Sequence, residues 1–201
     1  MELREALVQI AEIRRHMATS GVFRGYRSAP VAVSGLSALA AAVVQTRLIS
    51  DPAEHFNEYL TLWIGAAALS VIAMGVEMLI RLGRTQERGH WELTRLAIEQ
   101  FLPCIIAGAL LTAVFVRQMP QHVALLPGLW QILFSLGIFA SARLLPKQLF
   151  VVGAFYLCSG VVVLIWARDS FSLEPWCMGI PFVIGQVGAA AILYWTLERR
   201  T

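Results

Sequence analysis

A few polar side chains interrupt long apolar stretches of this sequence, and they are the residues that could do chemistry. Glu77 lies well inside an apolar run and precedes Arg81 by four residues, which places both on one face of a helix. A carboxylate beside a guanidinium inside a membrane could bind a proton or a substrate, or it could form an ion pair at the membrane interface. Because Glu77 lies only about 6 Å of helix from Arg81, the ion pair is favoured.

Two amides belong to the same class of residue. Gln131 and Gln186 each lie inside an apolar run, where the amide must find a hydrogen-bond partner. Hydrogen bonds between helices are one solution, and the lining of a pore or pocket is the other. Together with Glu77 and Arg81, these glutamines form the candidate polar intramembrane site.

The sequence contains none of the catalytic or cofactor patterns that we sought, namely GxSxG, HExxH, and the Walker and Rossmann glycine motifs. Asp51, Glu54 and His55 are residue types that bind metals, but their spacing fits no metal motif and is typical of an exposed loop. The three cysteines are an odd number without a CxxC pair. We therefore expect no metal and no cofactor, and a protein that is not an enzyme is favoured.

The elements that must position these residues are membrane-spanning helices. The chain has 201 residues, of which 58% are hydrophobic and only 14% charged, whereas a soluble domain has about 25% charged residues. This composition excludes a soluble globular domain, a disordered tail and a nucleic-acid-binding module. Crossing a bilayer takes about 20 residues. We predict an all-α bundle in residues 29–201, with six spans at about 30–46, 59–80, 99–116, 122–145, 149–167 and 176–197.

The basic residues predict the orientation of these spans. One side of the membrane would carry 13 of the 16 Lys and Arg residues, and the other side would carry 3. Such an excess over short loops is typical of the cytoplasmic side, so both termini are expected in the cytoplasm of a bacterial inner membrane. The first 28 residues are charged and lack the apolar core of a signal peptide. The net charge of +3 therefore reflects sorting between the two sides and not affinity for nucleic acid.

The N-terminal arm, residues 1–28, is predicted to begin with an amphipathic helix and to continue as a linker. Its apolar residues recur at intervals of three and four, as on one face of a helix. Three acids and three arginines balance the polar face, so apolar packing and not charge should decide where the helix lies. It could lie on the membrane or pack under the bundle, or it could bind a protein partner through Leu3, Leu7, Ile10, Ile13 and Met17.

Small residues and prolines predict how the spans pack. Ser34, Ala38 and Ala42 form a small-residue stripe on the first span, and Gly185 with Ala189 forms one on the sixth. Such stripes allow two helix backbones to approach closely. Prolines interrupt the third, fourth and sixth spans, where they could be innocent or could mark the kinks of a transporter: Pro103, Pro127 and Pro181.

The arm sequence EIRRHM with the following FRGY, and the stretch from PGLWQ to LCSG in the fourth and fifth spans, resemble a group of small bacterial inner-membrane proteins. In that group a charged amphipathic helix precedes about six spans, and a tryptophan followed by a glycine pattern marks a middle hairpin. Trp130 and Gly137 fit this pattern, whereas Ser135 stands where glycine is usual. The group has no established activity, so the resemblance implies only the fold and the location.

The sequence leaves two functions open. We predict a non-catalytic scaffold or regulator of the inner membrane that acts through helix packing and the cytoplasmic arm. The alternative is a small oligomeric solute transporter or channel that uses Glu77, Gln131 and Gln186. The expected partners are the lipid bilayer and either a second copy of the chain or a protein bound to the arm. A scaffold should bury its polar groups in dry helix contacts, whereas a transporter should expose them to water.

Overall fold

The computed structural model describes residues 28–84, 88–142, 144–169 and 171–199, which form helices and turns and contain no strand. The predicted arm lies outside these residues, so the placement of Leu3, Leu7, Ile10, Ile13 and Met17 stays a prediction. The main helices are α2 (Ser28–Leu48), α3 (Phe56–Arg84), α4 (Arg88–Gln118), α5 (Leu126–Ala140), α6 (Leu149–Ile165) and α7 (Pro175–Leu193). Shorter helices are η1 (Pro120–Leu125), η2 (Trp166–Asp169), η3 (Phe171–Leu173) and the π-helical turn η4 (Tyr194–Glu198).

Five helical segments of the described chain are long and apolar enough to cross a membrane, with η1 and α5 counted as one. The remaining helix, α6, is apolar but has only 17 residues. The all-helical fold is therefore confirmed, whereas the count of six spans is not.

One predicted span ends earlier than expected. α5 stops at Ala140, although the apolar run continues to Leu145. The chain turns there, because the Ala142 N–H donates to the Phe139 carbonyl at 3.1 Å. Pro146 then disfavours helical backbone at the residue before it. Hydropathy did not reveal this end, because Ala142, Leu144 and Leu145 continue the apolar run despite the single charge of Arg143.

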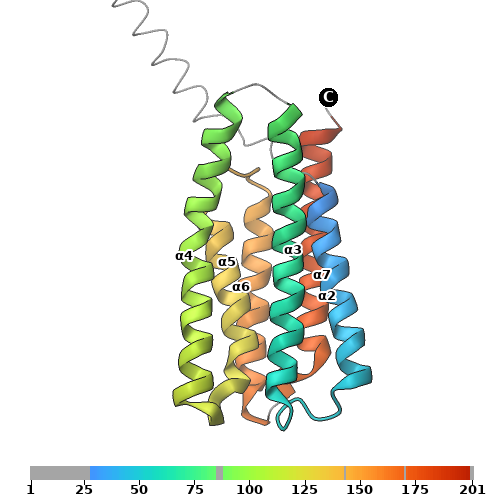
Figure 1. The fold of residues 1–201 in the computed structure, drawn as a ribbon, viewed down its shortest axis with the longest axis vertical. Helices are drawn as coiled ribbons and strands as arrows, with labels where there is room; N and C mark the ends of the chain where they lie inside the picture. The colour runs from blue at the N-terminus through green and yellow to red at the C-terminus, as the bar shows by residue number, and fades with distance from the viewer. Residues whose placement is uncertain (1–27, 85–87, 143, 170, 200–201) are drawn as a thin grey trace, which may run out of the picture.

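The helices run up and down between two ends of the bundle (Figure 1). We call one the Asp51 end, which carries the loop from α2 to α3, and the other the C-terminal end. α2 packs most extensively on α7 and also on α3, while α5 packs on α6 and α4. α6 and α7 join the two groups of helices. α3 and α4 are the most open to the surroundings, since 11% and 0% of their apolar segments are buried, against 44% for α7.

Small residues bring α2 and α7 together. A Cβ atom added to Gly179 of α7 would lie 2.6 Å from the Ala42 Cβ, and one added to Gly35 of α2 would lie 3.1 Å from the Gln186 Cβ. Ala38 and Ala42 are buried, as the small-residue stripe predicted. The stripe therefore serves packing within the chain.

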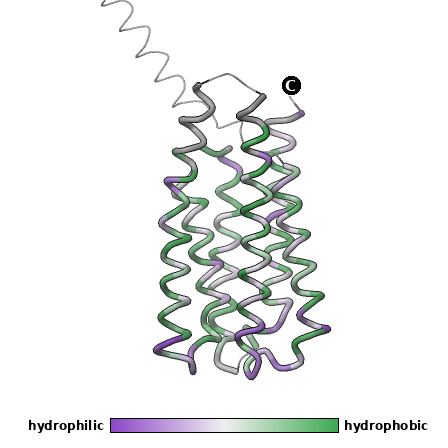
Figure 2. The backbone as a smooth tube through the Cα atoms, viewed as in Figure 1, coloured by the Kyte–Doolittle hydropathy of each residue, from purple (hydrophilic) through white to green (hydrophobic). Residues whose placement is uncertain are grey.

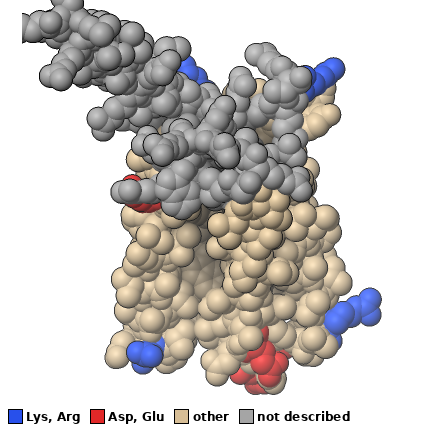
Figure 3. Space-filling model, turned by 45° about the horizontal axis from the view of Figure 1, so that its top comes forward, with Lys and Arg blue, Asp and Glu red and all other residues tan. Residues whose placement is uncertain are grey.

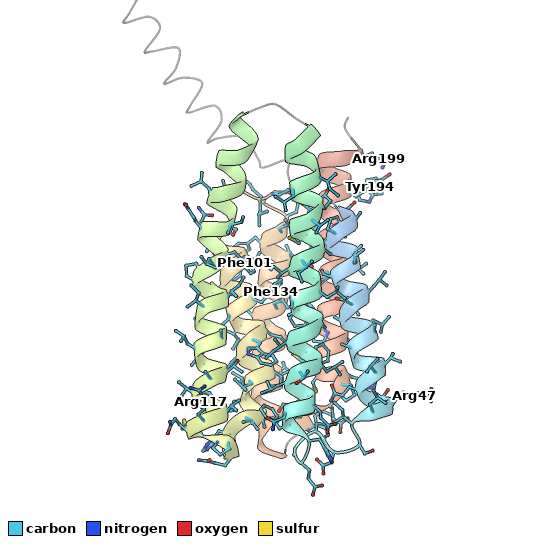
Figure 4. All side chains as sticks on the ribbon, in the orientation of Figure 1. Arg47, Phe101, Arg117, Phe134, Tyr194 and Arg199 are labelled. Atoms are coloured by element: carbon cyan, nitrogen blue, oxygen red, sulfur yellow. The ribbon has the colours of Figure 1, made fainter. Side chains whose placement is uncertain are left out.

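An aromatic cluster fills the middle of the bundle. The Phe134 ring of α5 lies 5.4 Å from the Phe101 ring of α4, 4.9 Å from the Tyr156 ring of α6 and 5.5 Å from the Phe182 ring of α7, between centroids. Figure 4 shows Phe101 and Phe134 pointing toward one another from neighbouring helices. These edge and tilted contacts join four helices around one ring.

The predicted interruptions by proline fall in two different settings. Pro103 and Pro181 lie inside α4 and α7, as expected, and both helices continue through them. Pro127, in contrast, lies in the first turn of α5, directly after η1. A proline is well tolerated there, because the first N–H groups of a helix have no partner within it. Pro127 therefore starts a helix and does not kink one.

Hydrophobic residues occupy most of the length of the described helices, and hydrophilic residues are concentrated at the Asp51 end (Figure 2). At the Asp51 end the described chain exposes Asp51, Glu54 and Glu58, and Figure 3 shows acidic side chains together there. Figure 4 places Arg47 and Arg117 at this end and Arg199 at the opposite end. An apolar middle between polar ends is typical of a membrane-spanning bundle.

Candidate functional site

Gln131 of α5 is fully buried, and both halves of its amide are bonded to neighbouring helices. Its Nε2 donates to the Cys177 carbonyl of α7 at 2.9 Å. Its Oε1 accepts from the Ser159 hydroxyl of α6 at 2.5 Å. The amide therefore joins three helices, which is the dry arrangement that interhelical hydrogen bonding predicts for a polar group in hydrocarbon.

A second glutamine, Gln45 of α2, has the same role and was missed in the sequence. It is also fully buried, and its Nε2 donates to the Leu173 carbonyl at 2.7 Å. Its Oε1 accepts from the Trp63 indole of α3 at 2.8 Å. The signal was available, because Gln45 is an amide inside an apolar run. Its position near the end of the span made it look like an ordinary boundary residue.

The two glutamines hold the same segment of chain. Leu173 ends η3 and Cys177 lies in the first turn of α7, so the two carbonyls belong to residues four positions apart in the chain. The Ser172 hydroxyl donates to the Ala124 carbonyl of η1, and the Cys177 thiol donates to the Phe171 carbonyl at 3.3 Å. We call this set the glutamine layer: Gln45, Trp63, Gln131, Ser159, and residues 171–178.

Beside the glutamine layer lies a buried hydroxyl without a partner. Tyr59, one turn before Trp63 on α3, is fully buried. Its ring stacks on Phe56, with centroids 5.7 Å apart, and tilts against Trp63 at 6.3 Å. No hydrogen bond to the Tyr59 hydroxyl occurs among the described residues. The phenol ring therefore packs against two aromatic neighbours, while its hydroxyl group contributes no hydrogen bond to stability.

A second tryptophan, Trp130, makes a hydrogen bond between helices like that of Trp63 to Gln45. The Trp130 indole of α5 donates to the Thr112 hydroxyl of α4 at 2.9 Å, and Thr112 in turn donates to the Gly108 carbonyl. In both hydrogen bonds the tryptophan follows its acceptor by 18 residues. Each bond joins the two helices of a hairpin whose connection lies at the Asp51 end. The hairpins α2–α3 and α4–α5 are thus joined by the same kind of hydrogen bond.

The other residues of the predicted site do not join Gln131. Gln186 is partly buried on α7, where its Cβ faces Gly35 of α2, and no described residue hydrogen-bonds to its amide. Glu77 is partly buried on α3, toward the other end of the bundle. The side chain of Arg81 is outside the described structure, so the ion pair with Glu77 stays a prediction. The partners of Gln131 are therefore Ser159 and Cys177, from α6 and α7.

The polar loop at the Asp51 end is built by local hydrogen bonds. The Asp51 carboxylate accepts the N–H groups of Ala53 at 2.9 Å and Glu54 at 3.3 Å, which is an Asx turn. His55 approaches the Asp51 carbonyl with its Nδ1 at 3.3 Å. In the described part of the chain, no group of three His, Cys, Asp or Glu side chains is placed to hold a metal ion.

Comparison with protein-family models, curated proteins and solved structures finds no match to this chain. Its chemistry must therefore be argued from the glutamine layer itself. Gln131 and Gln45 are both fully buried, and in each the amide nitrogen and the amide oxygen have a hydrogen-bond partner. Such an arrangement joins helices and fixes a segment of chain through hydrogen bonds between helices.

Proposed function

We propose that this chain is a non-catalytic integral membrane protein that acts as a scaffold or regulator. The observation that carries the proposal is the environment of Gln131, which is fully buried with both halves of its amide bonded to α6 and α7. A transport site needs polar groups that can exchange protein partners for water or solute. The most deeply buried polar groups of the described chain serve helix packing instead.

We further propose that all six helices span a bacterial inner membrane, with both termini in the cytoplasm. α6 rises about 26 Å over its 17 residues, and η2 follows it directly, so together they approach the hydrocarbon thickness of about 30 Å. The excess of Lys and Arg in the connections at the C-terminal end supports this orientation.

The output of such a protein would pass through the N-terminal arm. The proposed contact surface is the apolar stripe of Leu3, Leu7, Ile10, Ile13 and Met17. Deleting residues 2–17 should remove a co-purifying partner while the bundle still inserts into the membrane. If the deletion leaves the set of co-purifying proteins unchanged, the arm does not bind a partner. That result would contradict the proposal that the protein acts as a scaffold through its arm.

The alternative function, an oligomeric solute transporter or channel, requires Glu77, Gln131 and Gln186 to contact water. Thiol labelling in intact membranes distinguishes the two functions. The background variant carries Cys104→Ala, Cys158→Ala and Cys177→Ser, because serine can keep the hydrogen bond to the Phe171 carbonyl.

Single cysteines are then introduced by Gln131→Cys, Ser159→Cys and Gln186→Cys, with Glu54→Cys in the exposed loop as the positive control. Ser159→Cys retains a weak donor beside Gln131 and so guards against local unfolding. We expect a charged methanethiosulfonate reagent to modify position 54 alone. Modification at two or more of the other positions would establish a hydrated path and favour the transporter.

A further inference from the structure

A cavity of about 200 Å³ opens at the C-terminal end of the bundle, where α5 ends and α6 begins. Its walls include the buried side chains of Ile138 and Leu149, the partly buried Leu145, and Phe150, which is 59% exposed. Among the described residues of the lining, Lys147 carries the one charged side chain. We propose that this cavity binds an anionic phospholipid of the surrounding bilayer, with an acyl chain on the apolar wall and the phosphate beside Lys147.

The charge beside the cavity favours the binding of an anion. Lys147 is exposed, and no hydrogen bond or ion pair with the described residues engages its ammonium group. The sequence contains no Asp or Glu between Glu99 and Asp169, so α5, α6 and the turn that joins them supply no carboxylate. Basic residues at a membrane surface attract anionic headgroups when no acid neutralises them.

The depth of the cavity selects a lipid over a small soluble anion. α6 rises about 26 Å over 17 residues, and the hydrocarbon core of a bilayer is about 30 Å thick. Residues 144–148, which lead into α6, therefore lie near the boundary between hydrocarbon and headgroups. Figure 1 shows this segment set back from the ends of α3 and α4. A soluble phosphate ester would leave the apolar wall of Ile138 and Leu145 uncovered, whereas an acyl chain covers it.

The proposal is tested on the full-length protein in detergent, by native mass spectrometry during titration with phosphatidylglycerol or phosphatidylcholine. Lys147→Gln should weaken phosphatidylglycerol binding about fivefold, since one basic residue contributes about 1 kcal/mol near an anionic headgroup. Arg117→Gln is the matched control, because Arg117 is exposed at the Asp51 end, away from the cavity (Figure 4). The control should bind phosphatidylglycerol as the wild type does.

A second variant tests the apolar wall. Ala142 is exposed and lines the cavity, so the side chain of Ala142→Trp should fill the cavity without disturbing the packing of the core. This variant should weaken phosphatidylglycerol binding although Lys147 is intact. Glycerol 3-phosphate, which has no acyl chain, should not compete. Equal binding of the two lipids by the wild type, full binding by Lys147→Gln, or displacement by glycerol 3-phosphate would overturn the proposal.

Discussion

Single amide side chains carry much of the specificity in this bundle. Gln45 and Gln131 each use both halves of the amide, and each bonds to a backbone carbonyl in residues 171–178. Hydrogen bonds between membrane helices contribute about 0.6 kcal/mol on average and at most about 1.7 kcal/mol. Their larger effect is on position, because each glutamine fits only one register of its neighbours.

Gln131→Ala should lower the free energy of unfolding in detergent by about 1–2 kcal/mol, since two hydrogen bonds are lost inside the bundle. Gln186→Ala is the matched control, because no described residue hydrogen-bonds to Gln186. It should change the unfolding free energy by less than Gln131→Ala does. Equal effects in denaturant titrations would mean that the Gln131 bonds contribute nothing beyond the size of the side chain.

Tyr59 and Trp63 make a sharper pair, because they are neighbours on α3 with opposite hydrogen-bonding states. Tyr59→Phe removes a buried hydroxyl that has no partner, and an unpaired group of this kind costs about 1–3 kcal/mol. We expect Tyr59→Phe to keep or raise the melting temperature. Trp63→Phe removes the donor to Gln45 and should lower it. A loss of stability in Tyr59→Phe as large as in Trp63→Phe would contradict this assignment.

At the scale of elements, α5 and α6 meet through glycine. A Cβ atom added to Gly128 would lie 2.7 Å from the Gly160 carbonyl oxygen, and one added to Gly160 would lie 2.8 Å from the Gly128 carbonyl oxygen. Side chains of Leu164 and Ile132 lie equally near, but the backbone oxygen in each case cannot move aside as a side chain can. The two helices can therefore pack this closely only without a Cβ at the crossing.

Gly160→Ala should lower the free energy of unfolding by about 1–3 kcal/mol, the range for an overpacked contact. Gly188→Ala on α7 is the control, because an added Cβ there meets no atom within 4 Å. Alanine also favours a helix more than glycine does, so the control should be neutral or slightly stabilising. If both variants unfold at the same denaturant concentration, the crossing is looser than the structure indicates.

At the scale of the molecule, two polar ends flank an apolar middle. The described chain has acids and arginines at the Asp51 end, while the C-terminal end holds Lys147 and Arg199. The Arg199 guanidinium lies 4.1 Å from the centre of the Trp195 ring, and Tyr194 is exposed beside it. Such pairs of aromatic and cationic side chains are typical of a membrane interface.

Reporter fusions test the orientation that these charges predict. A cytoplasmic reporter at either terminus should be active, and a periplasmic reporter inserted after Glu54 in the α2–α3 loop should be active as well. The physical reason is the excess of Lys and Arg near the C-terminal end. Activity of the periplasmic reporter at either terminus would invert or break the predicted topology.

The sequence by itself determined the helical class, the apolar middle and the approximate helix positions. These features depend on local composition, because a bilayer requires helices that satisfy their own backbone hydrogen bonds. The small-residue stripe at Ala38 and Ala42 was readable for the same reason, since it lies along one face of one helix.

Only the tertiary structure decided what the polar residues do. The partners of Gln131 are a serine 28 residues away and a carbonyl 46 residues away, and Gln45 bonds to a carbonyl 128 residues away. No local pattern encodes such distances along the chain. The end of α5 at Ala140 and the cavity beside Lys147 likewise depend on a turn that begins inside a mostly apolar stretch of sequence. The register between two helices depends on how their side chains pack, and this packing depends on all of the helices that surround them.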